Sequence, residues 1–443
     1  MRASPRRSPA AWLVLAALSL LACQVLAPSA ATPGAATAVV APGTPEATPA
    51  VAPGTPAATL GPGGQRPADT PIPAGHFSVG PAALSFLAPA PLPGGVRLDD
   101  NRLPFLLLFP QLRDAPAPAW LAAGTRVTYR VQSATIPQVR GQASASGAGY
   151  VQYDLVALET DLAVATAKLY LDTSDGAAVL PSLIFPLLGR PGVGEFWINP
   201  DALVNAEQAA TAELAVTRLD QTLGPDKYHA VRFQYTHAGA RYVWMFDADS
   251  GLLLFFSWSI GGDADPNHQL GQVTLAARRQ LALPWQRGRL PAWVAQARRL
   301  HYSGSYATTV SGAGTVSLPA AATVTIQSTF DRWNAYSLST VIQGQSPATV
   351  EALTGGDQAF DGLWLAPEAL AALPDGQNLD TDPVTGAVLT VARDPSTVSL
   401  TETGQRYQTR LIYAADDGRL LETLQQQQIG LATITTDLKL DSQ

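Results

Sequence analysis

The chain is poor in charge and in sulfur. Of its 443 residues 14% are charged, against roughly 25% in an average soluble domain. It carries 28 basic and 35 acidic residues, for a net charge of −7. The chain therefore has no excess of positive charge with which to bind a nucleic acid, and we expect no nucleic-acid partner. A single cysteine, Cys23, excludes an intrachain disulfide and a zinc cluster of thiolates.

Long hydrophobic runs are also missing, with one exception near the N-terminus. Residues 10–21 form an apolar run that is too short to cross about 30 Å of hydrocarbon as a helix. Arg2, Arg6 and Arg7 precede the run, which gives the layout of an export signal. The run ends in Leu20-Leu21-Ala22-Cys23.

This ending resembles the lipobox of bacterial lipoproteins, in which a leucine, a free position and a small residue precede a cysteine. The resemblance implies that residues 1–22 are a removed signal peptide and that Cys23 carries lipid. It also implies export and a lipid anchor on the extracytoplasmic side of a bacterial membrane or at the cell surface. In the alternative reading, Cys23 stands by chance in an ordinary signal peptide. Because no other cysteine exists, we favour lipidation.

The lipidated N-terminus is expected to continue into a disordered linker over residues 23–75. The linker is almost entirely Ala, Pro, Thr, Gly and Val, and residues 41–48 recur in similar form at 52–59. Proline removes hydrogen-bond donors and glycine raises chain entropy, so no packed core forms. Such a segment spans on the order of 40 Å as a flexible coil and up to about 150 Å as polyproline helix. A stalk that holds the body off the membrane and a plain spacer both fit.

The body, residues 76–443, is predicted to be mainly β. Apolar and polar residues alternate in many segments, for example in 125–132, where Val127, Tyr129 and Val131 share one side and Arg126, Thr128 and Arg130 the other. This period of two indicates antiparallel strands. Residues 291–300 are predicted to be a short helix with proline in its first turn. Residues 76–118, which include the apolar stretch 103–110, are expected to pack as an N-terminal extension on the body.

An internal duplication organises this body. Residues 196–203 match 363–370, and 246–254 match 413–421, both 167 positions apart. Residues 214–218 match 389–393, and 146–149 match 311–314. We therefore predict two tandem homologous antiparallel β units, repeat 1 (119–290) and repeat 2 (291–443), each with one or two short helices. The pattern leaves open whether they share one sheet.

Each repeat carries the same local signals. Pro200 and Pro367 suit a helix start, and the acidic residues that follow them suit a helix N-terminus. Asp249-x-Gly251 and Asp416-x-Gly418 predict strand-to-strand turns, since Asp and Gly tolerate the required backbone angles.

Catalytic and metal-binding motifs are missing. The sequence has no nucleophile elbow, no His-Glu-x-x-His, no P-loop and no dinucleotide fingerprint. His229 and His237 fall on one strand face about 26 Å apart, too far for one metal ion, so we expect no metal and no cofactor. Asp263 and Asp265 begin a stretch like a calcium loop, but the turn glycine is missing. The pair Asp247 and Asp249 is better explained by turn chemistry, since Ala414 replaces the first in repeat 2.

Two features remain as candidates for ligand binding. Trp197 and Trp364 hold equivalent places in the two repeats, either as aromatic platforms for a sugar or apolar ligand or as buried core anchors. Leu183 and Phe185 lie in an apolar stretch that has no counterpart in repeat 2. That stretch is either a flap over a hydrophobic cavity or a loop pinned into the core.

These observations predict an exported, lipid-anchored and non-catalytic protein. Its β pattern and anchor resemble those of half-barrel, lipoprotein-carrier-type extracytoplasmic lipoproteins, which implies a curved sheet that grips an apolar ligand. The expected partners are the membrane, through the lipid on Cys23, and an apolar or glycan ligand, or the protein is a scaffold of the cell envelope. The alternative function is a cell-envelope hydrolase with dispersed carboxylates such as Asp263 and Asp265.

Overall fold

The computed structural model describes the body from residue 118 to residue 441, with gaps. The described residues are 118, 120–136, 145–158, 163–173, 178–179, 185–189, 196–224, 226–237, 240–260, 269–297, 299–357 and 362–441. The chain divides into two compact units, residues 1–59 and 60–443, and all described residues belong to the second.

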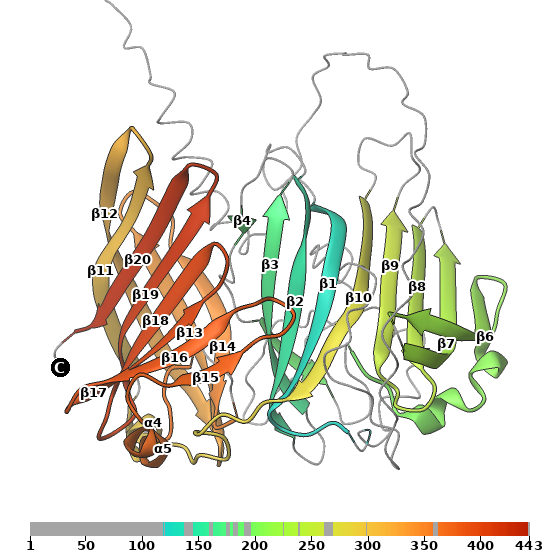
Figure 1. The fold of residues 1–443 in the computed structure, drawn as a ribbon, viewed down its shortest axis with the longest axis horizontal. Helices are drawn as coiled ribbons and strands as arrows, with labels where there is room; N and C mark the ends of the chain where they lie inside the picture. Colours follow the sequence, from blue (N-terminus) through green and yellow to red (C-terminus); the bar gives the residue numbers. More distant parts are fainter. Residues whose placement is uncertain are drawn as a thin grey trace, which may run out of the picture. The chain divides into compact units, whose positions relative to one another are not determined.

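The described part contains two antiparallel sheets (Figure 1), one from each repeat. Sheet 1 consists of β1 (Thr125–Ile136), β2 (Ala145–Leu158), β3 (Ala163–Thr173), β4 (Ala178–Val179), β5 (Phe185–Gly189), β6 (Leu214–Leu223), β7 (Asp226–His237), β8 (Ala240–Asp247), β9 (Leu253–Ile260) and β10 (Gln269–Gln280). Sheet 2 consists of β11 (Arg299–Val310), β12 (Gly314–Thr329), β13 (Trp333–Ile342), β14 (Ala348–Gly355), β15 (Asn378–Thr381), β16 (Val388–Arg393), β17 (Thr397–Thr403), β18 (Tyr407–Ala414), β19 (Leu420–Ile429) and β20 (Ala432–Leu440).

Both sheets have the same topology. The order is β4-β3-β2-β1-β10-β9-β8-β7-β6 in sheet 1, with β5 also on β3, and β14-β13-β12-β11-β20-β19-β18-β17-β16-β15 in sheet 2. In each sheet the first strand pairs with both the second and the last strand, so the chain meanders to one edge, crosses to the other and returns. The predicted fold class, two tandem homologous antiparallel β units, is confirmed, and the repeats form separate sheets.

The crossing segment of each repeat meets the predicted Asp-x-Gly turn. Trp197 bridges to Leu252, and Trp364 bridges to Arg419 in the same way. Gly251 and Gly418 both have a φ of 71°, a left-handed backbone that favours glycine. A Cβ on Gly418 would lie 1.9 Å from the carbonyl oxygen of Leu365. The turn therefore requires glycine both for its backbone angle and for close approach of the crossing segment.

Short helices follow each bridge. The predicted helix starts at Pro200 and Pro367 are confirmed by the 3-10 helix η2 (Pro200–Leu203) and by α5 (Pro367–Ala372); a second 3-10 helix, η3 (Ala206–Ala209), follows η2. Arg218 donates to the carbonyl of Val204 at 2.7 Å, and Arg393 to that of Ala371 at 2.6 Å. The matched arginines of β6 and β16 thus satisfy free carbonyls at the helix ends.

The predicted helix over 291–300 is too long. Its helical part, α4, covers only Ala292–Gln296, with Pro291 as N-cap. Arg299 and Leu300 instead begin β11, where Arg299 pairs with Thr325 of β12. Cross-strand pairing has overridden the local helical pattern there.

The duplication extends further than the matched blocks predict. The Pro-Ala-Trp sequence at 118–120 recurs at 291–293. The indole of Trp120 donates to the carbonyl of Ser250 at 2.6 Å, and that of Trp293 to the carbonyl of Asp417 at 3.0 Å. In both repeats a tryptophan from the start of the repeat thus holds the Asp-x-Gly turn.

A buried ionic cluster joins the repeats. Arg126 of β1 donates to the Asp154 carboxylate at 2.7 and 2.9 Å and to Asp382 of repeat 2 at 3.3 Å. Arg279 of β10 donates to Asp380 at 2.7 and 2.6 Å and to Asp382 at 3.1 Å. Burial alone would raise the pKa of the Asp382 carboxyl, but the charge of Arg126, a backbone N–H and the charge of Arg279 hold that pKa well below its usual range.

A second buried ion pair lies beside this cluster. Lys168 of β3 donates to the Glu402 carboxylate of β17 at 2.9 and 3.2 Å, and the Tyr407 hydroxyl donates to the same carboxylate at 3.0 Å. Repeat 2 therefore covers the polar side of β1. Arg126 and Thr128, which lie on that side, are both buried.

Apolar contacts complete the junction of the repeats. Val156 and Ala157 of β2 cluster with Trp333, Ala335 and Leu353 of repeat 2. The connection between the sheets contributes Leu281, Leu283 and Trp285 to the core of repeat 2.

We expect Gly418→Ala to lower the free energy of unfolding by roughly 2–4 kcal/mol, because the new Cβ meets the Leu365 carbonyl and the backbone stays left-handed. Gly386→Ala is the matched control: its φ is also 71°, but nothing lies within 4 Å of the new Cβ. It should cost only about 1–2 kcal/mol. Urea unfolding of both variants measures the difference, and equal losses would contradict the close-approach argument.

Removing the lysine from the buried Lys168–Glu402 ion pair should strongly lower the stability of the body. We expect Lys168→Met to lower the free energy of unfolding by about 3–5 kcal/mol, since Glu402 would stay buried without its cation. Lys439→Met is the control, because it removes the ion pair with Glu422, in which the lysine side chain is 62% exposed. This variant should lower the free energy of unfolding by no more than about 1 kcal/mol. If Lys168→Met unfolds at the same urea concentration as the wild type, the cluster does not hold the repeats together.

Candidate functional site

Several residues that the sequence selects lie outside the described part of the chain. These are Cys23, Leu183, Asp263 and Asp265. Phe185 is the first residue of β5, which pairs with β3. Their proposed roles therefore stay predictions.

Trp197 and Trp364 lie in the cores of the repeats. Their exposed fractions are 3% and 0%. The Trp197 ring packs edge-on against Phe196 with 4.7 Å between centroids, and the Trp364 indole donates to the Asn334 side chain at 2.7 Å. Neither ring offers an open face to a ligand, so this geometry fits core anchors rather than aromatic platforms.

Metal ligands do not cluster in the described residues. No group of three His, Cys, Asp or Glu there is placed to hold a metal ion, and no helix among them is long and apolar enough to cross a membrane. Asp247 has a structural role, since its carboxylate accepts from the Ser250 hydroxyl at 2.5 Å and the Ser250 N–H at 3.2 Å in the turn.

The ionic cluster between the repeats is also unsuited to a ligand. The cavity lined by Arg126, Asp380, Asp382 and Glu402 has a volume of about 10 Å³, about the space of one water molecule. The carboxylates of Asp380, Asp382 and Glu402 each accept from a cation. The cluster is therefore part of the packing between the repeats.

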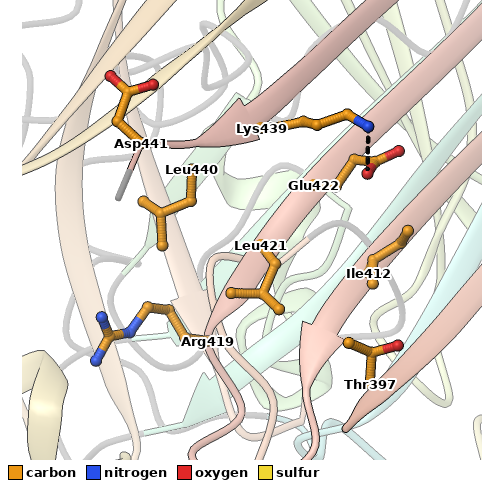
Figure 2. A pocket seen from close by; sticks show the side chains of 8 residues that line it. All are labelled: Thr397, Ile412, Arg419, Leu421, Glu422, Lys439, Leu440 and Asp441. Atoms are coloured by element: carbon orange, nitrogen blue, oxygen red, sulfur yellow. Dashed lines mark ion pairs between the residues drawn. The ribbon is translucent and has the colours of Figure 1, made fainter. Parts of the chain in front are cut away.

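A larger groove lies on sheet 2 (Figure 2). Its volume is about 550 Å³, within the range of small-molecule sites. It lies where β17 and β19 begin and β18 and β20 end, so one end of four neighbouring strands forms it. The lining residues are Thr397, Ile412, Arg419, Leu421, Glu422, Lys439, Leu440 and Asp441.

A β-bulge shapes this groove. Ile412 pairs with Glu422, whereas the next residue, Tyr413, pairs with Leu420. Leu421 is thus the extra residue on β19, and bulges of this kind re-aim side chains at the end of a ladder. As a result, two successive residues, Leu421 and Glu422, both line the groove. The Leu-Leu pair at 420–421 breaks strict alternation and is the sequence signal that could have located the bulge.

Charges of both signs border the aliphatic side chains. Figure 2 shows Leu421 and Leu440 between Arg419 on one side and the Glu422–Lys439 pair on the other. The Lys439 ammonium lies 3.1 Å from the Glu422 carboxylate. The hydrogen bond with Glu422 and the charge of that carboxylate raise the pKa of Lys439. Lys439 therefore presents a positive charge to the groove at neutral pH.

Arg419 is held at the other side of the groove. Its guanidinium lies over the Trp293 ring, 4.9 Å from the centroid, and pairs with the Asp417 carboxylate at 3.0 Å. The groove thus combines three aliphatic side chains with preset charges, an arrangement that suits an amphiphile with an aliphatic part and a charged head.

A second groove, on sheet 1, is more polar. Its volume is about 500 Å³, and Leu219 is its only large apolar lining residue. The other lining residues are Arg218, Asp220, His229, Ala230 and Ala248. The groove on sheet 2 is therefore the better candidate for an apolar or amphiphilic ligand.

Comparison of the whole chain with models of known protein families gave no match, and comparison with curated proteins gave no significant one. The functional interpretation therefore depends on the anchor sequence and on the groove of sheet 2.

Proposed function

We propose that this chain is a membrane-anchored extracytoplasmic lipoprotein that binds an amphiphilic molecule of the cell envelope without catalysis. The groove on sheet 2 is the binding site. The observation that carries this proposal is the set of three aliphatic side chains, Ile412, Leu421 and Leu440, bordered by paired charges.

The N-terminus supports the location. The apolar run ends in Leu20-Leu21-Ala22-Cys23, and residues 24–75 supply a spacer of the kind that separates a body from a membrane. A lipid contributes about 0.8 kcal/mol per buried methylene, so more than one acyl chain gives stable anchoring.

The chemistry of the groove supports the ligand class. When the alkyl chain of a ligand covers these aliphatic side chains, each Å² of apolar surface removed from water favours binding by about 25 cal/mol. Arg419 and Lys439 can pair with a phosphate, and Glu422 and Asp441 with an ammonium group. A glycan fits less well, because the lining includes no aromatic ring.

Binding can be measured with a fluorescent short-chain phosphatidylcholine and the Cys23→Ser chain. We expect saturable binding that weakens about 10- to 100-fold in Ile412→Asp, since an aliphatic contact is worth roughly 1.5–3 kcal/mol. Val316→Asp is the control, because Val316 is 51% exposed on sheet 2 and lies outside the groove. Equal affinities in the two variants, or no binding by the parent chain, would refute the assignment of the groove.

The anchor has an independent test. Cys23→Ser should move the protein from the membrane fraction to the soluble fraction and remove the mass of the acyl chains from the intact protein. Fractionation and mass spectrometry measure both effects, and unchanged partitioning would exclude a lipid on Cys23.

A further inference from the structure

Two neighbouring hairpins of sheet 2, β11–β12 and β19–β20, end side by side (Figure 1). Residues 311–313 close the first hairpin, and residues 430–431 close the second. The N–H of Ser311 donates to the carbonyl of Leu431 at 3.1 Å, which holds the two loops together. We call residues 311–313 and 430–431 the paired tips.

The paired tips present apolar side chains to solvent. Leu431 is 78% exposed, and Val316, close to the start of β12, is 51% exposed. Gly430 has a φ of 55° and supplies the left-handed backbone of the two-residue turn. Such turns favour Gly, Asn, Asp or Ser, so turn geometry does not require the leucine. Packing within the described residues does not explain Leu431 either, because most of its surface is open.

Charge is missing from both hairpins near the tips. Residues 302–330 and 423–436 include no Asp, Glu, Lys, Arg or His. On β20 the first charged residue after Leu431 is Asp437, six residues or about 20 Å further along the strand. The ends of the hairpins can therefore leave water without the desolvation of a charge.

Uncharged polar side chains fill the space between the tips and the first charges. The strand registers align one such row two residues beyond Leu431, and its members are Gln428, Thr433, Thr309 and Thr315. The hydroxyls of Thr309 and Thr315 are hydrogen-bonded at 2.8 Å. The hairpins thus change from apolar to uncharged polar to charged along the strand direction.

We infer that the paired tips dip into the surface of a lipid bilayer. The polar headgroup layer on each side of a bilayer is roughly 5–8 Å thick, and the row at Thr433 follows Leu431 by about 7 Å. Leu431 at the acyl boundary thus places the hydroxyl and amide side chains among the headgroups. Arg406, whose carbonyl accepts from the N–H of Gln428 at 2.9 Å, sits beside this row, where a cation suits lipid phosphates.

This contact is separate from the ligand groove and from the lipid on Cys23. The groove includes Leu440 at the other end of β20, nine residues or about 30 Å from Leu431, so contact at the tips leaves it open. A weak contact is sufficient, because the proposed lipid on Cys23 holds the body near the membrane and makes the second contact intramolecular.

Co-sedimentation of the unlipidated Cys23→Ser chain with phosphatidylcholine vesicles tests the inference. We expect Leu431→Asp to weaken partitioning at least about 10-fold, since an apolar contact is lost and a charge enters the interface. Val341→Asp is the matched control, because Val341 is 42% exposed on β13 of the same sheet and lies outside the paired tips. Val341→Asp and the groove variant Ile412→Asp should both partition like the parent chain.

A fluorescent label locates the contact. In the Cys23→Ser chain, Leu431→Cys provides a single thiol for an environment-sensitive dye, whose emission should shift to shorter wavelength when vesicles are added. The same dye on Val341→Cys should not shift.

Three results would overturn the inference. The first is a parent chain that does not partition, or equal partitioning of Leu431→Asp and Val341→Asp. The second is a loss of partitioning in Ile412→Asp alone, which would assign the membrane contact to the groove and leave the proposed function in place. The third is a shift of the Leu431→Cys dye that rises with protein concentration without vesicles, which would identify a second copy of the chain as the partner.

Discussion

The buried ionic cluster between the repeats is the constraint on which the arrangement of the body depends. Charges in a medium of low polarity must keep their partners, because an unpaired buried charge costs several kcal/mol. Asp380, Asp382 and Glu402 must therefore stay against Arg126, Arg279 and Lys168. This requirement fixes the β15–β17 part of sheet 2 on β1, β3 and β10 of sheet 1 and removes that face of sheet 1 from solvent.

The duplication supplied two copies of one sheet, which the chain uses differently. Both copies keep the crossing tryptophan, the Asp-x-Gly turn and the bulge on the following strand, where Leu254 and Leu421 are the extra residues. Leu254 is fully buried in repeat 1, whereas Leu421 lines the groove of repeat 2. The same bulge and the same residue type are thus closed off in repeat 1 and open in repeat 2, and the open copy is where we place the ligand.

Much of the fold could be predicted from the sequence because its signals are local. Alternation located β1, β2 and β7, and the repeated blocks located the turns at Gly251 and Gly418. The ionic cluster could not be predicted, because Arg126 and Asp382 are 256 residues apart in the sequence. The alternation of polar and apolar residues in β1 shows only that Arg126 and Val127 point in opposite directions, and does not show what Arg126 contacts. The groove was missed because the bulge at Leu421 breaks the two-residue alternation of the strand. The burial of Trp197 and Trp364 follows from tertiary packing, which the spacing of residues along the sequence does not encode.

The central claim, an amphiphile site on sheet 2, can be tested most directly by methyl NMR of isoleucine δ1 groups in the Cys23→Ser chain. Ile412 lines the groove, while Ile198 and Ile434 are 0% and 3% exposed in the cores of the repeats. Titration with a short-chain phosphatidylcholine below its micelle concentration should shift the Ile412 signal in a saturable manner and leave the other two signals in place. An unchanged Ile412 signal, or equal shifts of all three, would contradict the account.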